Sequence, residues 1–341
     1  MIFERLASFP RVKIAHVPTV IEEMPNLAKA LGGPKLFVKR DDCTGVAFGG
    51  NKARQLEYLF GEAVKQGADT VLITGAIQSN YARMAAAVAR RLGMFCHIQL
   101  EERVPDVDEL YRKSGNVLLD RLLGAELHSY PEGEDEEGAD LALESIADDL
   151  RKKGAKPYVI HLGPGHPPLG ALGYIEAAKE FLEQSEEMGL KIDDIILASG
   201  SGLTQGGLLF GLRALGSSVR LTGNCHRRDA VRQKERVTHV LKGIAKLLDI
   251  SCPAAEEDIF LFDGAVGPGY GRMNDATREA ILLAAQNEAL FCDPVYSGKA
   301  MAGLIALIRQ GRFSRETNVL FWHTGGQPAI FAYADKIFPN Q

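Results

Sequence analysis

The sequence has few cysteines, no excess of basic residues and no long apolar run. Its 5 cysteines are scattered and form no Cys-x-x-Cys pair, which argues against a disulfide framework or a zinc site. With 39 basic and 44 acidic residues, the net charge is −5, so no general positive field attracts nucleic acid. No stretch approaches the ~18 apolar residues of a membrane span, and the charged N-terminal residues do not suit a signal peptide. We therefore expect a cytoplasmic protein with no metal and with neither nucleic acid nor membrane as a partner.

Strand-like and helix-like patterns alternate along the chain. Apolar runs rich in β-branched residues predict strands, and apolar residues at i, i+3, i+4 and i+7 predict helices. This alternation is typical of parallel sheets that are covered by helices on both faces. At about 150 residues per domain, the 341 residues predict two α/β domains, each an open and mostly parallel sheet. The predicted strands are 69–74, 95–100, 126–129, 157–162, 194–198, 219–224, 259–262 and 318–322, and the clearest helices are 54–67, 82–89, 117–123 and 139–150.

Three other segments interrupt or accompany this pattern. The acidic stretch 132–138 is expected to be an exposed loop, and the Gly/Pro-rich stretch 163–170 is expected to be a hinge. A basic cluster at roughly helical spacing is interpreted as a solvated helix face without a function. That cluster consists of His226, Arg227, Arg228, Arg232, Lys234 and Arg236.

A glycine-rich loop follows the predicted strand 194–198 and leads into a helix. It reads SGSGLTQGGL from Ser199 to Leu208. Backbone N–H groups and the helix dipole at such a turn favour an anion, and phosphate is the natural guest. The loop matches neither the dinucleotide fingerprint nor the P-loop, and close packing is the alternative explanation for its glycines.

A lysine, Lys52, stands at the start of a predicted helix directly after Gly49, Gly50 and Asn51. The helix dipole disfavours a cation there and predicts a lowered pKa, which suits bond formation with an aldehyde. The alternative is an ordinary surface lysine.

Polar side chains also follow other predicted strands. Gln78, Ser79 and Asn80 come at a helix start, where free N–H groups suit a carboxylate; a plain N-cap serine is the alternative. The segments 293–299 and 323–327 each follow an apolar run. A phosphate cup, a reactive amine, a carboxylate cradle and hydroxyl-bearing loops together fit pyridoxal phosphate. A non-catalytic protein that binds a phosphorylated small molecule is the alternative from another class.

Motifs in nearly all parts of the chain carry a family resemblance. They are FVKRDD (37–42), GGNKARQLEYL (49–59), GAIQSN (75–80), LGALGY (169–174), ASGSGLTQGGL (198–208), GPGYG (267–271), DPVYSGKAMAGL (293–304) and HTGG (323–326). Together they resemble the D-cysteine desulfhydrase and 1-aminocyclopropane-1-carboxylate deaminase family, a fold-type-II, tryptophan-synthase-β-like group of pyridoxal phosphate enzymes. The resemblance implies a homodimer in which a small domain, 54–162, is inserted into a large domain, 1–53 and 163–341. It also implies that the cofactor lies in the cleft between the domains.

The resemblance further implies roles for individual residues. Lys52 would bond the cofactor and act as base on the substrate α-carbon, and Asn80 would bond the ring hydroxyl. The implied cofactor-binding residues are Lys52, Asn80, Gly200, Ser201, Gly202, Leu203, Thr204, Ser297 and Thr324. The implied catalytic residues are Lys52, Ser79, Tyr270 and Tyr296. The implied substrate-binding residues are Gln78, Ser79, Asn80, Tyr81, His166 and Arg272.

Two positions favour one reaction within this family. The cyclopropane deaminases resemble one another in having Glu and Leu where this chain has Ser297 and Thr324. A carboxylate opposite the pyridine nitrogen strengthens the electron sink for ring opening, whereas a neutral hydroxyl does not. We therefore expect β-elimination of the D-cysteine desulfhydrase type, with 1-aminocyclopropane-1-carboxylate deaminase as an alternative.

Three positions depart from the desulfhydrase pattern. Tyr81 stands where His is usual, His166 lies in an unusual Gly-His-Pro-Pro segment, and Arg272 follows GPGYG where an apolar residue is common. One hypothesis is that His166 and Arg272 supply positive charge for an anionic leaving group, as in L-cysteate sulfo-lyase. Surface charge or loop packing is the alternative.

Overall fold

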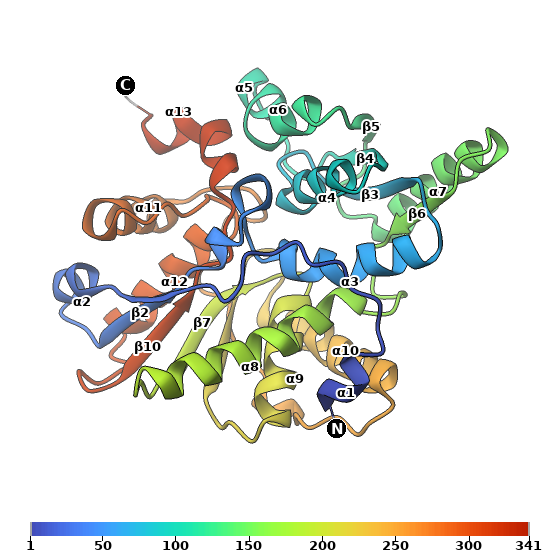
Figure 1. Ribbon diagram of the computed structural model, residues 1–341. Coiled ribbons are helices and arrows are strands. Elements are labelled where there is room, and N and C mark those ends of the chain that lie inside the picture. Colours follow the sequence, from blue (N-terminus) through green and yellow to red (C-terminus); the bar gives the residue numbers. More distant parts are fainter. Residues whose placement is uncertain (1, 340–341) are drawn as a thin grey trace.

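The chain folds around two separate β-sheets, which lie side by side in the ribbon view (Figure 1). A computed structural model describes residues 2–339. The larger sheet has the strand order β1-β2-β10-β7-β8-β9, and the smaller has the order β5-β4-β3-β6. All neighbouring strands are parallel except β1 and β2. The strands are β1 (Ile21–Glu23), β2 (Lys35–Lys39), β3 (Thr70–Ala76), β4 (Phe95–Glu101), β5 (Glu126–Tyr130), β6 (Pro157–Ile160), β7 (Asp194–Ser199), β8 (Arg220–Cys225), β9 (Phe260–Phe262) and β10 (Asn318–Trp322).

Helices cover both faces of each sheet, as the alternating pattern predicts. Helices α8, α9 and α10 pack on one face of the large sheet, and α2, α11 and α12 pack on the other. Helices α3 and α4 cover one face of the small sheet, and α7 covers the other. No helix within residues 2–339 carries an apolar run of membrane-spanning length. The helices are α1 (Ile2–Leu6), α2 (Pro25–Leu31), α3 (Lys52–Lys65), α4 (Asn80–Arg91), α5 (Glu109–Lys113), α6 (Gly115–Leu122), α7 (Glu136–Lys152), α8 (Leu172–Glu187), α9 (Leu203–Ala214), α10 (Ala230–Leu248), α11 (Asp275–Glu288), α12 (Ser297–Arg309) and α13 (Ala334–Ile337).

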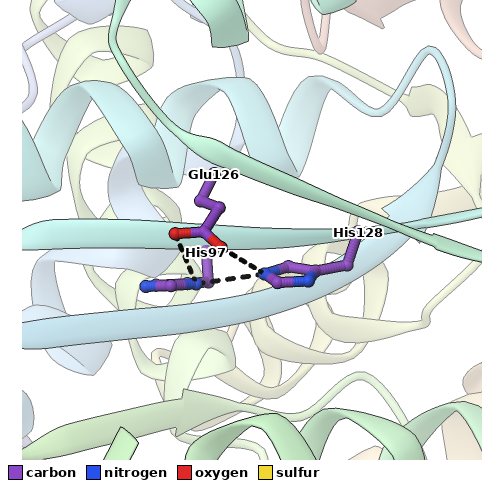
Figure 2. A group of neighbouring side chains, drawn as sticks. All are labelled: His97, Glu126 and His128. Atoms are coloured by element: carbon purple, nitrogen blue, oxygen red, sulfur yellow. Dashed lines mark hydrogen bonds and ion pairs between the residues drawn. The ribbon is translucent and has the colours of Figure 1, made fainter.

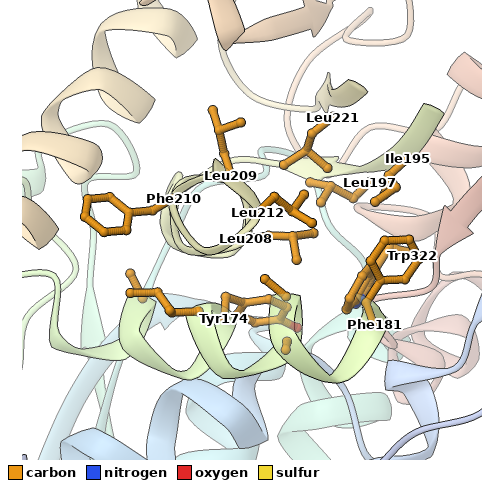
Figure 3. Packing of buried hydrophobic residues seen from close by; sticks show 14 of the residues in the cluster. Tyr174, Phe181, Ile195, Leu197, Leu208, Leu209, Phe210, Leu212, Leu221 and Trp322 are labelled. Carbon is orange, nitrogen blue, oxygen red and sulfur yellow. The ribbon is translucent and has the colours of Figure 1, made fainter. Parts of the chain in front are cut away.

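The strands of the large sheet bury their side chains on both faces. Ile195 and Leu197 of β7 pack with α8 and α9, and Figure 3 shows them near Trp322 of β10. Ile196, between them, belongs to the core on the opposite face. Successive side chains of a strand point to opposite faces, so a strand covered on both sides reads as a continuous apolar run.

The sequence-based predictions of these elements agree with the structure in most places. The predicted fold class, two mostly parallel sheets with helices on both faces, is confirmed. The short strands β1 and β2 were not predicted, and the loop prediction for 132–138 is wrong in its second half. Helix α7 already begins at Glu136, where Asp135 caps it by accepting a hydrogen bond of 2.9 Å from the N–H of Gly138. The domain boundaries at 53/54 and 162/163 stay a prediction.

A buried carboxylate, Asp41, joins the large sheet to helix α3. It follows β2, is fully buried, and accepts hydrogen bonds from Arg54 (2.9 Å), Tyr174 (2.7 Å) and the indole of Trp322 (2.8 Å). Burial alone would raise the pKa of Asp41, but Arg54, Lys39 and Trp322 together outweigh it and the pKa is lowered. Arg54 lies in the first turn of α3, two residues after Lys52. The carboxylate therefore fixes the start of the helix that carries this lysine.

Replacing Asp41 with asparagine is expected to lower the free energy of unfolding by roughly 3 kcal/mol, because Arg54 then loses a buried ionic partner. Urea denaturation at pH 7 measures the loss. Because the pKa of Asp41 is lowered on folding, its stabilisation is present above the ordinary value of 3.8 and is lost as the pH falls through the lowered pKa. The variant should lack this part of the acid dependence. Asp249→Asn, at a side chain that is 94% exposed, is the control, and an equal loss in both variants would contradict the argument.

Candidate active site

A cavity lies where the carboxyl ends of strands from both sheets face each other. This is where parallel α/β sheets bind ligands. The loops after β3, β4, β7, β8 and β10 all contribute to its wall. The structure brings most of the predicted site residues together here: Lys52, Ser79, Asn80, Tyr81, Gly200, Ser201, Gly202, Thr204, Tyr270, Tyr296 and Thr324 line the cavity.

Direct hydrogen bonds join the lysine helix to the glycine loop. Asn51 precedes Lys52, and Gln55 follows it by one turn of α3. The side-chain amides of Asn51 and Gln55 each donate a hydrogen bond of 2.9 Å to the hydroxyl of Thr204. Thr204 closes the glycine loop at the start of α9. The lysine and the predicted phosphate cup therefore lie on adjoining parts of one wall.

The amine of Lys52 has few polar neighbours. Its Nζ lies 3.3 Å from Oε1 of Gln55 and 4.7 Å from the ring centroid of Tyr81. Burial lowers its pKa to about 8. The predicted direction is thus found, and its cause in the structure is loss of solvent. Burial also lowers the pKa of Lys299 to about 8, but that amine donates to the carbonyls of Val266 and Gly269. Of these two lysines, Lys52 alone lines the cavity.

The glycine loop has a backbone that other residues would not tolerate. Gly202, the N-cap of α9, has φ +83°, in the left-handed region. A Cβ atom on Gly200 would lie 2.3 Å from the ring of His226. Close approach of backbone N–H groups at the positive end of a helix suits a phosphate.

Three polar atoms of cavity-lining residues lack a hydrogen-bond partner. They are the hydroxyl of Tyr81, Nδ1 of His226 and Nε of Arg227. Burial, together with the charges of Lys299 and Lys52, lowers the pKa of His226 to about 3, so this ring is neutral at physiological pH. Unpaired buried polar atoms are rare in folded proteins. With the cavity amine of Lys52 and the glycine loop, these atoms fit a ligand that carries an aldehyde and a phosphate.

The loop after β3 presents the residues predicted to hold a carboxylate. Ser79 caps α4, and its Oγ accepts a hydrogen bond of 3.2 Å from the N–H of Ala82. The side-chain oxygen of Asn80 accepts a hydrogen bond of 3.0 Å from Asn116. Both side chains are thus held in place while they line the cavity.

Two tyrosines form another part of the wall. The hydroxyls of Tyr270 and Tyr296 share a hydrogen bond, and the two rings meet edge to face at 5.9 Å. Burial raises the pKa of both hydroxyls, so both keep their protons near neutral pH. The guanidinium of Arg103, just after β4, lies 5.8 Å from the ring centroid of Tyr270. Arg103 lines the cavity and was not predicted.

A cluster of ionic side chains borders the glycine loop and joins the two sheets. Glu136, the first residue of α7, accepts hydrogen bonds from Arg227 (2.9 Å), Arg228 (2.5 Å) and Arg236 (3.1 Å). Burial would raise the pKa of Glu136, but these three guanidinium groups lower it. Arg236 also donates to the carbonyl of Ser201 at 3.3 Å. The cluster therefore ties helix α7 of the small sheet to the glycine loop.

This cluster corrects one prediction made from the sequence. The basic segment at 226–236 was interpreted as a solvated helix face, but the side chains of Arg227 and Arg236 are only 8% and 11% exposed. His226, Arg227, Arg228 and Arg236 all line the cavity. Of the basic side chains in the segment, that of Arg232 is 75% exposed and that of Lys234 is 39% exposed. The partner Glu136 lies 91 residues before Arg227, which no local pattern reveals.

Several predicted site residues lie away from the cavity wall. Gln78 donates to the carbonyls of Tyr111 and Ser114 and thus braces the start of α6. Leu203, Ser297, His166 and Arg272 are also absent from the wall. Ser297 is buried against the carboxylate of Asp293 (2.7 Å), His166 stacks on His161, and Arg272 is exposed. The expectation that His166 and Arg272 supply charge to the site has no support in their positions.

Comparisons with known proteins agree with this geometry. A family model described as "Pyridoxal-phosphate dependent enzyme" matches residues 12–325. The chain is 40% identical over 332 residues to 1-aminocyclopropane-1-carboxylate deaminase of Burkholderia vietnamiensis, covering 97% of this chain and 98% of that protein. It is 42% identical over 333 residues to D-cysteine desulfhydrase of Salmonella typhi, covering 98% and 99%. A crystal structure of a homologue of 1-aminocyclopropane-1-carboxylate deaminase superposes with a TM-score of 0.88 at 35% identity, covering 99% of this chain and 98% of that one.

The buried amine gives a measurable prediction. In protein prepared without ligand, modification of Lys52 by an amine-selective reagent should rise with pH to a midpoint at about 8, because only the unprotonated amine reacts. Peptide mass spectrometry follows each lysine, and Lys191, with a side chain that is 90% exposed, is the internal reference. If Lys52 still gained reactivity around its ordinary pKa of 10.5, the buried environment described above would be wrong.

Proposed function

Because the chain belongs to the family of pyridoxal-phosphate-dependent enzymes, we propose that it is a β-eliminating lyase acting on a small cysteine-like amino acid. Its general type is that of 1-aminocyclopropane-1-carboxylate deaminase and D-cysteine desulfhydrase. In the proposed reaction, D-cysteine and water give pyruvate, ammonia and hydrogen sulfide. The observation that carries the proposal is that the described residues of the cavity wall include no free carboxylate.

The cavity wall has no free carboxylate within the described part of the chain. Its one acidic side chain, Glu136, is engaged by three arginines. Thr324 contributes a neutral hydroxyl to the wall, and the hydroxyl of Ser297 donates to Asp293. A carboxylate facing a pyridine nitrogen would keep that nitrogen protonated. Its absence favours elimination of a good leaving group over opening of a carbon ring.

Pyridoxal phosphate, when bound, supplies an aldehyde that condenses with amines and a pyridine ring that withdraws electrons from the substrate α-carbon. We infer that Lys52 holds the aldehyde end and that the loop from Gly200 to Thr204 holds the phosphate. Asn80, fixed by Asn116, would bond the ring hydroxyl. The hydrogen bonds that Asn51 and Gln55, on either side of Lys52, donate to Thr204 support this arrangement.

Side chains of the cavity can also accept and donate the protons that the reaction transfers. With a pKa of about 8, the amine of Lys52 is partly unprotonated near neutral pH and can take the proton from the α-carbon. Ser79 and the free N–H groups at the start of α4 would orient the substrate carboxylate. The hydroxyl pair of Tyr270 and Tyr296 keeps its protons near neutral pH, since burial raises both pKa values. We propose that this pair gives a proton to the departing sulfur.

We also propose that the enzyme is a homodimer in the cytoplasm. The dimer rests on the family resemblance, and its mass in solution tests it. A reducing compartment is consistent with cysteines that all remain free thiols in the described residues.

Product analysis tests the proposed reaction. The purified enzyme with bound cofactor should release sulfide and pyruvate from D-cysteine, and Lys52→Ala should lower the rate roughly 10³-fold because the base is lost. Lys191→Ala is the matched control and should keep full activity. If the enzyme converts 1-aminocyclopropane-1-carboxylate to 2-oxobutyrate faster than it converts D-cysteine, the proposed function is wrong and ring opening is the main reaction. A colourless protein that cannot be reconstituted with the cofactor would favour the non-catalytic alternative.

A second candidate function is a sulfo-lyase of the L-cysteate type, in which sulfite replaces sulfide as leaving group. It is favoured by the cations of the cavity wall: Lys52, Arg103, Arg227, Arg228 and Arg236 line it together with one carboxylate, that of Glu136. Outside the wall, Glu134 also pairs with Arg227 at 3.0 Å. Arg103 is held by Glu101 at 2.8 Å and lies beside the tyrosine pair rather than beside the phosphate cup. A sulfonate carries a full negative charge, and a planar guanidinium recognises such oxygens through paired hydrogen bonds.

Arg103→Gln separates the two candidate functions. If the arginine binds a sulfonate, the variant should raise KM for L-cysteate about 10–100-fold, which corresponds to one charged hydrogen bond. KM for D-cysteine should change much less. Arg112→Gln, at an exposed ion pair with Glu102, controls for general effects on this region. Equal losses with both substrates, or no sulfite release by the unmodified enzyme, would remove the sulfo-lyase candidate.

A further inference from the structure

A group of metal-ligating side chains lies on the small sheet, outside the cavity. His97 belongs to β4, and Glu126 and His128 belong to the neighbouring edge strand β5. The register places His97 opposite Glu126, with His128 two residues further along. Residues two apart in a strand point to the same face, so all three side chains meet there. Figure 2 shows the two imidazole rings edge to edge, with the carboxylate beside the facing nitrogens.

The three side chains lie close enough for one small cation to bridge them once the rings have turned. Nδ1 of His97 and Nε2 of His128 are 3.0 Å apart and share a hydrogen bond, with the two rings in nearly one plane (17°). The carboxylate oxygens of Glu126 lie 3.7 Å from the first nitrogen and 3.8 Å from the second. Zinc bonds to nitrogen and oxygen at ~2.0–2.2 Å, so a tetrahedral site separates its donor atoms by ~3.3 Å. Because the two nitrogens point at each other, a cation would replace the proton that they share, and both rings would turn so that their lone pairs meet at one point.

The charge of the group also suits a divalent cation. Glu126 supplies a negative charge, and each of the two imidazoles offers a ring nitrogen as a ligand atom. The side chain of Glu126 is 65% exposed, whereas those of His97 and His128 are 10% and 27% exposed. A cation would thus reach the imidazoles from the solvent side and find a carboxylate there.

We propose that His97, Glu126 and His128 bind one divalent transition-metal cation of the zinc type. The site contains no cysteine, so the scattered cysteines of the sequence did not indicate it. His97 lies four residues before the last residue of β4, about 13 Å along the strand from the cavity end, which separates the site from the proposed active site. The cation would link the edge strand β5 to β4.

A second group of similar composition does not share this geometry. Asp140, His161 and His166 lie close together, but the two imidazole rings stack face to face at 3.6 Å with an angle of 4°. Lone pairs of imidazole nitrogens lie in the ring plane, so stacked rings cannot aim them at one ion. His161 also engages Glu144 through Nε2 at 3.0 Å. This group therefore serves as the internal comparison.

Zinc binding to the holoenzyme tests the proposal. The protein is freed of metal with EDTA, desalted and dialysed against Zn²⁺, and bound zinc is counted by mass spectrometry. All proteins carry Cys43→Ser, which removes the exposed thiol as a competing ligand. We expect one zinc per chain and a rise in Tm of roughly 3–8 °C at saturating zinc. Glu126→Gln and His128→Gln should weaken binding at least ~10-fold and abolish the rise in Tm.

His166→Gln is the matched control at the second group and should bind zinc as the parent protein does. Cofactor absorbance and Tm in EDTA show whether each variant is folded, and both altered positions are partly exposed. Zinc retained equally by His128→Gln, zinc lost in His166→Gln, or no zinc bound by the parent protein would each overturn the proposal. A zinc-dependent Tm in Glu126→Gln that matches the parent would do the same.

Discussion

The buried ion pair of Asp41 and Arg54 is the contact on which the geometry of the site depends. Lys52 is at the first position of α3, where a helix would ordinarily fray. Arg54, one half-turn later, is held by a carboxylate that also takes hydrogen bonds from the core residues Tyr174 and Trp322. The position of the Lys52 amine is thus fixed relative to the centre of the large sheet. Burying such charges has a cost, and in return the reactive group has a defined position.

The cavity is a product of both sheets. The large sheet supplies the glycine loop and the basic residues after β8, and the small sheet supplies the loops after β3 and β4. Glu136 of α7 meets three arginines of the large sheet at the boundary. This contact neutralises part of the positive charge beside the glycine loop, whereas Arg103 pairs with Glu101 at the end of β4. The electrostatic character of the pocket is therefore decided by contacts between the sheets.

Sequence reasoning was accurate where the relevant physics is local. Strand β10 is found at the predicted residues, because a doubly covered strand must be apolar throughout. Gly202 and Lys52 stood out, because a left-handed turn and a lysine at a helix start are unusual in any protein. The Glu136 cluster was missed since its partners are 91 to 100 residues apart. The two histidines of β4 and β5 were missed for the same reason: only strand pairing brings them together. His166 was predicted to bind substrate because of the unusual residues around it, but in the structure it stacks on His161 away from the cavity wall.

The paired hydrogen bonds from Asn51 and Gln55 to Thr204 have one more consequence. They attach two successive turns at the start of α3 to one hydroxyl of the glycine loop, so the position of Lys52 relative to that loop is fixed from both sides. If Lys52 and the loop 200–204 hold the two ends of the cofactor as proposed, this fixed spacing selects for length. An aldehyde whose anionic arm is a carbon longer or shorter would then reach one end and miss the other.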